Sequence, residues 1–145
     1  MKKLISFLLM LTLTLFSVGC DILNQSPSKL VELETYSNMT LDGTTSIEVK
    51  YEYYNDDVRN LYEFVIDDQE TIGKVMTGLF NVELKDYPKH QLITFAIRLI
   101  TVKQGENEFS INLACVSNAN GNRYLCESQD VYAIIEKYIE DNLMK

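Results

Sequence analysis

Residues 109–115, FSINLAC, decide the fold class, because apolar side chains at every second position alternate with small or polar ones. A period of two is typical of a β-strand that buries one face. The dipeptide Asn120-Gly121 favours a two-residue hairpin turn, and Tyr124 and Cys126 continue the apolar pattern after it. The sequence therefore predicts an antiparallel β-hairpin over residues 109–126.

This hairpin is predicted to bring two cysteines together. Cys115 and Cys126 are equally far from the centre of the Asn120-Gly121 turn, so they should face each other across it. Opposed residues in an antiparallel pair have Cα atoms about 4.5 to 5.5 Å apart, a separation that a disulfide tolerates. We expect a structural disulfide between Cys115 and Cys126. A buried reduced pair, a metal site and a catalytic thiol are the alternatives.

A further strand is predicted immediately upstream. Residues 93–99 place apolar side chains at odd-numbered positions, which should form the buried face. For this face to meet the odd-numbered face of residues 109–115, the connection needs an odd number of loop residues. Residues 105–107 can provide it, with Asn107 in the left-handed conformation.

The first half of the chain is predicted to supply a second hairpin. Residues 47–53 alternate apolar and charged side chains, and residues 62–66 have an apolar side as well. Residues 55–57, Asn-Asp-Asp, should form the turn between them. A weaker alternation at residues 30–36 favours an additional edge strand.

Two helices are predicted from their caps and apolar stripes. Asp67 with Glu70 forms an acidic variant of the capping box, and Ser128 is suited to N-cap a C-terminal helix with Asp130 in its first turn. The first stripe is Ile72, Val75, Met76 and Leu79. The second stripe is Val131, Ile134, Ile135, Tyr138 and Leu143. The resulting order predicts an α+β fold: an antiparallel sheet of about five strands with two helices packed on one face.

The first twenty residues are organised like a secretory signal. Lys2 and Lys3 precede an apolar run, residues 4–16, which is shorter than the roughly 20 residues that a membrane span needs. Ser17-Val18-Gly19-Cys20 resembles the lipobox of bacterial lipoproteins, although those proteins usually have leucine where this chain has Ser17. The resemblance implies cleavage before Cys20 and a diacylglycerol anchor on its thiol, with palmitate as an expected acyl chain. The alternative is an ordinary secreted protein in which Cys20 is incidental.

The expected organisation is a signal peptide at residues 1–19, a lipidated tether at residues 20–29 and a single α+β domain at residues 30–145. The formal net charge of −8 is unfavourable for nucleic acid and for adsorption to anionic lipid. We therefore expect attachment through Cys20, on the extracytoplasmic face of the cell membrane.

The sequence has few candidates for catalysis. Its one histidine, His90, is interpreted as a solvated loop residue. Without a second histidine, neither a metal-binding triad nor a serine hydrolase triad can be assembled in the usual way. The acidic pairs at 56–57 and 67–68 lack the ligand spacing of a calcium loop. We expect no catalytic residue, no metal and no cofactor. An envelope enzyme that uses Asp and Glu carboxylates is the rival hypothesis.

Tyrosine is abundant, with nine residues and no tryptophan. Core packing explains most of them, but aromatic side chains on an outer face are typical of a recognition surface. The candidates on the first hairpin are Tyr51, Tyr53, Tyr54 and Tyr62.

Residues 46–141 look like small cell-surface lipoproteins of uncharacterised function in low-GC Gram-positive bacteria. The shared pattern is the strand-rich order, the entry Ile66-Asp67-Asp68 into a short helix and a closing tyrosine-rich helix. Together with the lipobox, it favours a lipid-anchored binding or accessory module that is not an enzyme. Its partner would be a neighbouring membrane protein, another envelope component or an incoming peptide. Some lipoproteins of this kind bind antimicrobial peptides, so self-protection through binding of a cationic peptide is a further alternative, as is a structural or chaperone-like role.

Overall fold

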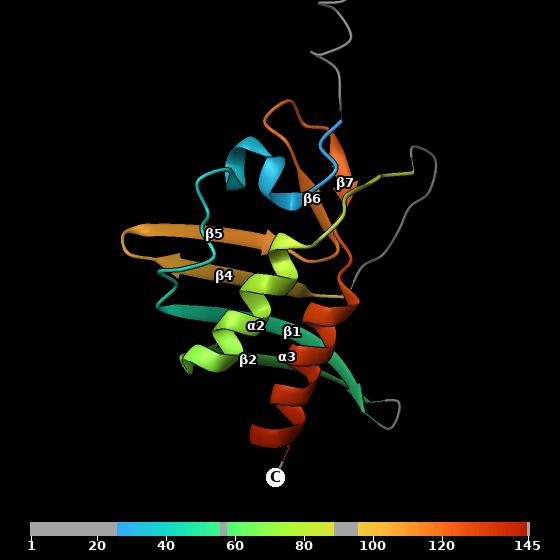
Figure 1. Ribbon diagram of the computed structural model, residues 1–145. Coiled ribbons are helices and arrows are strands. Elements are labelled where there is room, and N and C mark those ends of the chain that lie inside the picture. The colour runs from blue at the N-terminus through green and yellow to red at the C-terminus, as the bar shows by residue number, and fades with distance from the viewer. Residues whose placement is uncertain (1–25, 56–57, 89–95, 145) are drawn as a thin grey trace, which may run out of the picture.

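The computed structural model describes residues 26–55, 58–88 and 96–144. Its elements are η2 (Leu30–Glu32), η3 (Glu34–Tyr36), β1 (Ser46–Asn55), β2 (Val58–Ile66), α2 (Gln69–Phe80), β3 (Lys85–Asp86), β4 (Arg98–Gln104), β5 (Asn107–Asn112), β6 (Cys115–Ser117), β7 (Arg123–Leu125) and α3 (Gln129–Asn142). A larger antiparallel sheet has the strand order β2-β1-β4-β5, and a smaller one has the order β3-β7-β6. Figure 1 shows α2 and α3 side by side on one face of the larger sheet. The α+β prediction is confirmed, but the strands form two sheets instead of one.

The first hairpin forms as predicted. β1 pairs with β2 in the register Tyr51 opposite Tyr62, with Asn55 opposite Val58 at the turn. The turn residues 56 and 57 lie outside the described residues. Ile47 and Tyr51 of β1 are fully buried, because the odd-numbered face of this strand is covered by the helices.

The helices begin close to the predicted positions. The N-cap of α2 is Asp68, not Asp67: the Asp68 carboxylate accepts a hydrogen bond from the Thr71 backbone N–H at 2.8 Å. That hydrogen bond also holds the pKa of Asp68 below its ordinary value. Ser128 caps α3, as predicted, by accepting from the Val131 N–H.

Both apolar stripes are largely confirmed. The stripe of α2 is buried along its whole length. In α3, Val131 and Ile135 are buried as expected, but Leu143 is 41% exposed, since the helix ends at Asn142. Ile139 and Tyr132 are buried in its place.

The buried face of β4 is the opposite of the predicted one. Gln104 lies opposite Asn107, so the loop between β4 and β5 has two residues instead of three, and Gly105 takes a positive φ of 61°. This shorter loop shifts the register and places Ile100 and Val102 in the core. Residues 93–95 of the predicted strand lie outside the described residues.

The predicted strand 109–115 is interrupted between β5 and β6. The Asn112 side chain accepts a hydrogen bond from the Ala114 N–H at 3.0 Å, a local turn that competes with strand pairing. Leu113 and Ala114 are both buried at this bend, and the chain passes there from the larger sheet to the smaller one.

The turn between β6 and β7 is longer than predicted. Asn118 N–H donates to Asn122 O and Gly121 N–H donates to Asn118 O, both at 3.0 Å, so the loop has three residues. Gly121 takes a positive φ of 80° at its last position, the arrangement expected of a three-residue hairpin loop. Cys115 consequently lies opposite Leu125 and not opposite Cys126.

The predicted edge strand at residues 30–36 is wrong, because this segment forms the short 3-10 turns η2 and η3. Leu30, Leu33 and Tyr36 are buried. Their spacing of three matches the period of a 3-10 helix, which a test for alternation does not detect.

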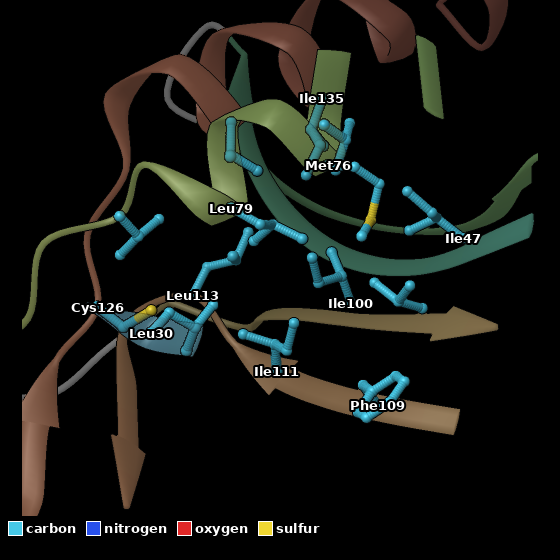
Figure 2. Packing of buried hydrophobic residues seen from close by; sticks show 14 of the residues in the cluster. Leu30, Ile47, Met76, Leu79, Ile100, Phe109, Ile111, Leu113, Cys126 and Ile135 are labelled. Carbon is cyan, nitrogen blue, oxygen red and sulfur yellow. The ribbon is translucent and has the colours of Figure 1, made fainter. Parts of the chain in front are cut away.

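The core lies between the larger sheet and the two helices. In Figure 2, Ile47, Ile100 and Ile111 of the sheet point toward Met76 and Leu79 of α2, with Ile135 of α3 beside them. Leu30, Leu113 and Cys126 extend this cluster toward the smaller sheet. One face of the larger sheet is therefore filled by apolar packing.

Candidate functional site

Among the described residues, no helix lies on the other face of the larger sheet (Figure 1). We call it the open face and define it by the side chains that point away from the helices: Glu48, Lys50, Glu52 and Tyr54 of β1; Arg59, Leu61, Glu63 and Val65 of β2; Ile97 before β4; Leu99, Thr101 and Lys103 of β4; Glu108, Ser110 and Asn112 of β5. This face is the main surface of the described chain on which large apolar side chains gather.

Apolar side chains on the open face form two rows. Leu61 and Val65 lie on β2, on one side of β1, and Ile97 and Leu99 lie on the β4 side. All four are exposed, Leu61 by 48% and Leu99 by 37%. Tyr54 continues the face at the far end of β1 and is exposed as well. Exposed apolar groups that lie close together on a rigid sheet are characteristic of contact surfaces.

Ion pairs link charged side chains of β1 to charged side chains of β2 and β4 on the open face. Lys50 Nζ lies 2.6 Å from Glu63 Oε1, and Lys103 Nζ lies 2.5 Å from Glu48 Oε1. The hydrogen bond with Glu48 raises the pKa of Lys103. Because all four side chains stay partly accessible to solvent, the pairs add little stability, but they fix the positions of the charges on the open face.

Glu52 is an unusual member of the open face, since its side chain is almost completely buried. Its carboxylate forms an ion pair with Arg59 and accepts a hydrogen bond from the Ile97 N–H at 3.2 Å. The bond with Glu52 raises the pKa of Arg59. A buried carboxylate is acceptable only when it is paired in this way, so Arg59 is held in place beside Leu61.

A shallow hollow of about 420 Å³ lies on the open face. Its lining includes Glu48, Lys50, Glu63, Val65 and Leu99. Because apolar side chains and the carboxylates of Glu48 and Glu63 line the same hollow, it can accept a side chain that has an aliphatic stem and a cationic head, as lysine does.

The four candidate tyrosines divide between two faces. Tyr51 is fully buried, and its hydroxyl donates to Glu136 of α3 at 2.7 Å. Tyr53 donates to Glu140 at 2.6 Å and packs against Tyr62, with 6.5 Å between ring centroids. A recognition role for Tyr51 is therefore wrong, because no partner can reach it. Of the four, Tyr54 alone belongs to the open face.

The hydrogen bonds from the sheet to α3 also alter tyrosine acidity. The bond to Glu140 raises the pKa of Tyr53 to about 12, because a neighbouring carboxylate opposes ionisation of the phenol. Burial, followed by the bond to Glu136, raises the pKa of Tyr51 as well. These tyrosines hold α3 on the sheet in their neutral form.

Arg98 is a half-buried cation that sequence reasoning missed. Its guanidinium carbon lies 4.2 Å from the ring centre of Tyr132 and 5.7 Å from that of Tyr51. Its Nε atom is buried without a hydrogen-bond partner among the described residues. An even-numbered position in β4 was predicted to be solvent-exposed, so the reversed face of this strand explains the omission.

Cys115 and Cys126 are unbonded thiols in the structure. Burial, followed by the proximity of Cys115, raises the pKa of Cys126 to about 12. The predicted direct opposition is wrong, because the loop has one residue more than expected. The disulfide itself stays a prediction.

Cys20 and His90 lie outside the described residues. Within the described ranges, no group of three or more metal-binding side chains converges, and no helix there has the length and apolar character of a membrane span. Hydrogen bonds from the backbone of Ser28 and Lys29 lower the pKa of Glu32, so this carboxylate serves a local turn.

No protein family matches the chain, and neither the comparison with curated proteins nor that with solved structures finds a similar protein.

Proposed function

We propose that this protein is a lipid-anchored, extracytoplasmic binding module that takes a basic, partly apolar polypeptide segment on its open face. The observation that carries the proposal is the open face itself, where Leu61, Val65 and Leu99 are exposed together on a sheet whose other face is filled. A sheet that needed only to fold would carry polar residues at these positions.

Charge supports a basic partner over an acidic one. The formal net charge of the chain is −8, and a protein of this sign accelerates the approach of cations by long-range attraction. The open face has four carboxylates, on Glu48, Glu52, Glu63 and Glu108, and three cationic side chains. Binding is expected to weaken as salt increases.

The lipobox resemblance at Ser17–Cys20 supports the location. Acyl chains on Cys20 hold a protein at the membrane almost permanently, since each buried CH₂ contributes about 0.8 kcal/mol. The binding module then acts at the cell surface, where basic segments of a neighbouring membrane protein and incoming cationic peptides are both accessible.

Cys20→Ala tests the location. The variant should move from the membrane fraction to the soluble fraction, because the acyl chains supply the attachment. If it still sediments with membranes in high salt, the lipid anchor is not what holds the protein.

Cell phenotypes test which source of basic segment is relevant. A gene deletion should increase sensitivity to cationic peptides if free peptides are the ligand, and complementation with the wild-type chain but not with a Leu99→Ser/Val65→Ser variant should restore resistance. An unchanged sensitivity profile would exclude self-protection and leave a segment of a neighbouring protein as the ligand.

A further inference from the structure

The two outer strands of the larger sheet differ in how their edges are covered. At the β5 edge, the Tyr36 hydroxyl of η3 donates to Ser110 O at 3.0 Å. A backbone carbonyl that points away from β4 is therefore already hydrogen-bonded to a side chain. At the opposite edge, β2 has β1 on one side and no partner strand on the other among the described residues. Unpaired backbone groups along a long edge strand are a template for another strand.

The backbone groups of β2 that point outward can be identified from the ladder. In an antiparallel sheet, successive residues bond alternately to the two neighbouring strands. Glu52 N–H donates to Ile97 O at 2.7 Å, so the even-numbered residues of β1 bond toward β4 and the odd-numbered ones toward β2. Tyr51 pairs with Tyr62, which means that even-numbered residues of β2 are used by β1. The outward groups belong to residues 59, 61, 63 and 65.

The outward residues of β2 are complementary to themselves. When two β2 strands run antiparallel with Leu61 opposite Leu61, Arg59 lies opposite Glu63 of the second copy, and this pair occurs twice. In the same register Val58, which is 58% exposed, lies opposite Phe64 on the helix-covered face. Cross-strand pairs of opposite charge and of apolar residues are the ones that stabilise sheets.

Other registers lose this match. An axis at residue 59 or 63 places Arg59 opposite Arg59 or Glu63 opposite Glu63, and like charges in direct opposition are destabilising. An axis at residue 60 or 62 places Arg59 or Glu63 opposite Leu61. The axis at Leu61 alone combines opposite charges with an apolar centre.

The charges available for this contact are already positioned. Arg59 is paired with Glu52, and Glu63 with Lys50, yet their side chains stay 62% and 61% exposed. A guanidinium has five N–H donors and a carboxylate accepts several hydrogen bonds. Arg59 and Glu63 can therefore each bind a second partner of opposite charge. In the dimer, Arg59 would contact Glu52 of its own copy and Glu63 of the second copy.

We propose that two copies of this chain associate through antiparallel pairing of β2, with Leu61 on the two-fold axis. The two larger sheets join edge to edge, and the two open faces become one continuous surface on the side away from the helices. Attachment of both copies to one membrane raises their effective concentration. The proposed dimer does not depend on which ligand the open face binds.

Cysteine cross-linking in membranes of cells that express the full chain tests the register. Cα atoms of a hydrogen-bonded antiparallel pair are about 5.5 Å apart, which is within disulfide range. Leu61→Cys should give a covalent dimer under mild oxidation. Arg59→Cys and Glu63→Cys should each fail alone and cross-link when the two variants are expressed together. The wild-type chain controls for the native cysteines.

A charge variant tests the contact without cross-linking. Glu63→Arg should weaken dimerisation by roughly tenfold or more, because it places an arginine opposite Arg59 of the second copy, as measured by analytical ultracentrifugation of the Cys20→Ala chain. Arg59 is left unchanged because it pairs with the buried Glu52. Circular dichroism checks that the variant is folded. Lack of a Leu61→Cys dimer, or equal cross-linking by Arg59→Cys alone, would overturn the proposal. A monomer whose β2 amides become protected only when a basic peptide is added would also overturn it, in favour of peptide addition at this edge.

Discussion

A side chain at Gly78 of α2 would collide with Val131 in the first turn of α3. A Cβ atom built on Gly78 lies 2.7 Å from Val131 Cγ2, whereas a Cβ atom on Gly73 meets nothing within 4 Å. Val131 is fully buried, so it has little room to move. The close approach of the two helices therefore requires a glycine at position 78 but not at position 73.

The two glycines should respond oppositely to alanine. Gly78→Ala should lower the free energy of unfolding by about 1 to 3 kcal/mol, the usual cost of an overpacked contact. Gly73→Ala should raise it by about 0.5 to 1 kcal/mol, because glycine weakens a helix interior. Urea denaturation of both variants checks this pair. Stabilisation by both substitutions would show that α2 and α3 are not packed as described.

The buried face of β4 can be tested with adjacent residues. Ile100→Ala should cost about 2 to 5 kcal/mol, because Ile100 is fully buried against the helices. Leu99→Ala should cost less than about 1 kcal/mol, because Leu99 lies on the open face. The urea midpoints of the two variants show which residue is in the core. A larger loss of stability in Leu99→Ala than in Ile100→Ala would favour the strand orientation that the sequence alone predicts.

Two glycine turns explain why the strand registers were not predictable. Gly105 is the first residue of a two-residue loop and Gly121 is the last residue of a three-residue loop, and both take positive φ. Glycine is equally suited to both positions, so the local sequence does not distinguish them. One residue more or less exchanges the faces of a strand, which is why Leu99 was expected in the core.

Elements defined by several agreeing local features were predictable. The first hairpin and both helices have a clear period together with caps or turn residues. The partners of these elements were not predictable, because the contacts join distant positions: Tyr51 and Glu136 are 85 residues apart. The alternation in β1 correctly separates Tyr51 from Tyr54, but it cannot reveal which of the two faces α3 covers.

Alkaline pH should destabilise the domain. Burial, followed by the proximity of Cys126, raises the pKa of Tyr36 to about 12, compared with about 10 in an unfolded chain. The neutral phenol is thus favoured by folding, and its contribution is complete below pH about 10 and disappears as the pH rises through about 12.

Tyr36→Phe isolates this contribution. At neutral pH the variant should lose about 0.5 to 1.5 kcal/mol with the hydrogen bond to Ser110 O. Above pH 10 its stability should decline less steeply than that of the wild type, because one ionisation that opposes folding is gone. Parallel curves of unfolding free energy against pH would show that Tyr36 ionises as readily in the folded state as in the unfolded one.

The proposed extracytoplasmic location predicts the oxidation state of Cys115 and Cys126. Thiols outside the cytoplasm are usually oxidised, so we predict that the intact mass rises by about two hydrogens after reduction in denaturant. Alkylation of both thiols without prior reduction would instead show that they stay unbonded, as they are in the structure.

Binding of a defined peptide tests the role of the open face most directly. The chain has no tryptophan, so the fluorescence of a peptide with alternating lysine and leucine and a single tryptophan reports binding without interference. We predict saturable binding to the Cys20→Ala chain, binding about tenfold weaker for Leu99→Ser/Val65→Ser, and no change for Leu143→Ser, which alters an exposed leucine immediately after α3. Equal affinity in all three proteins, or equal binding of a peptide with glutamate in place of lysine, would contradict a basic-segment site on the open face.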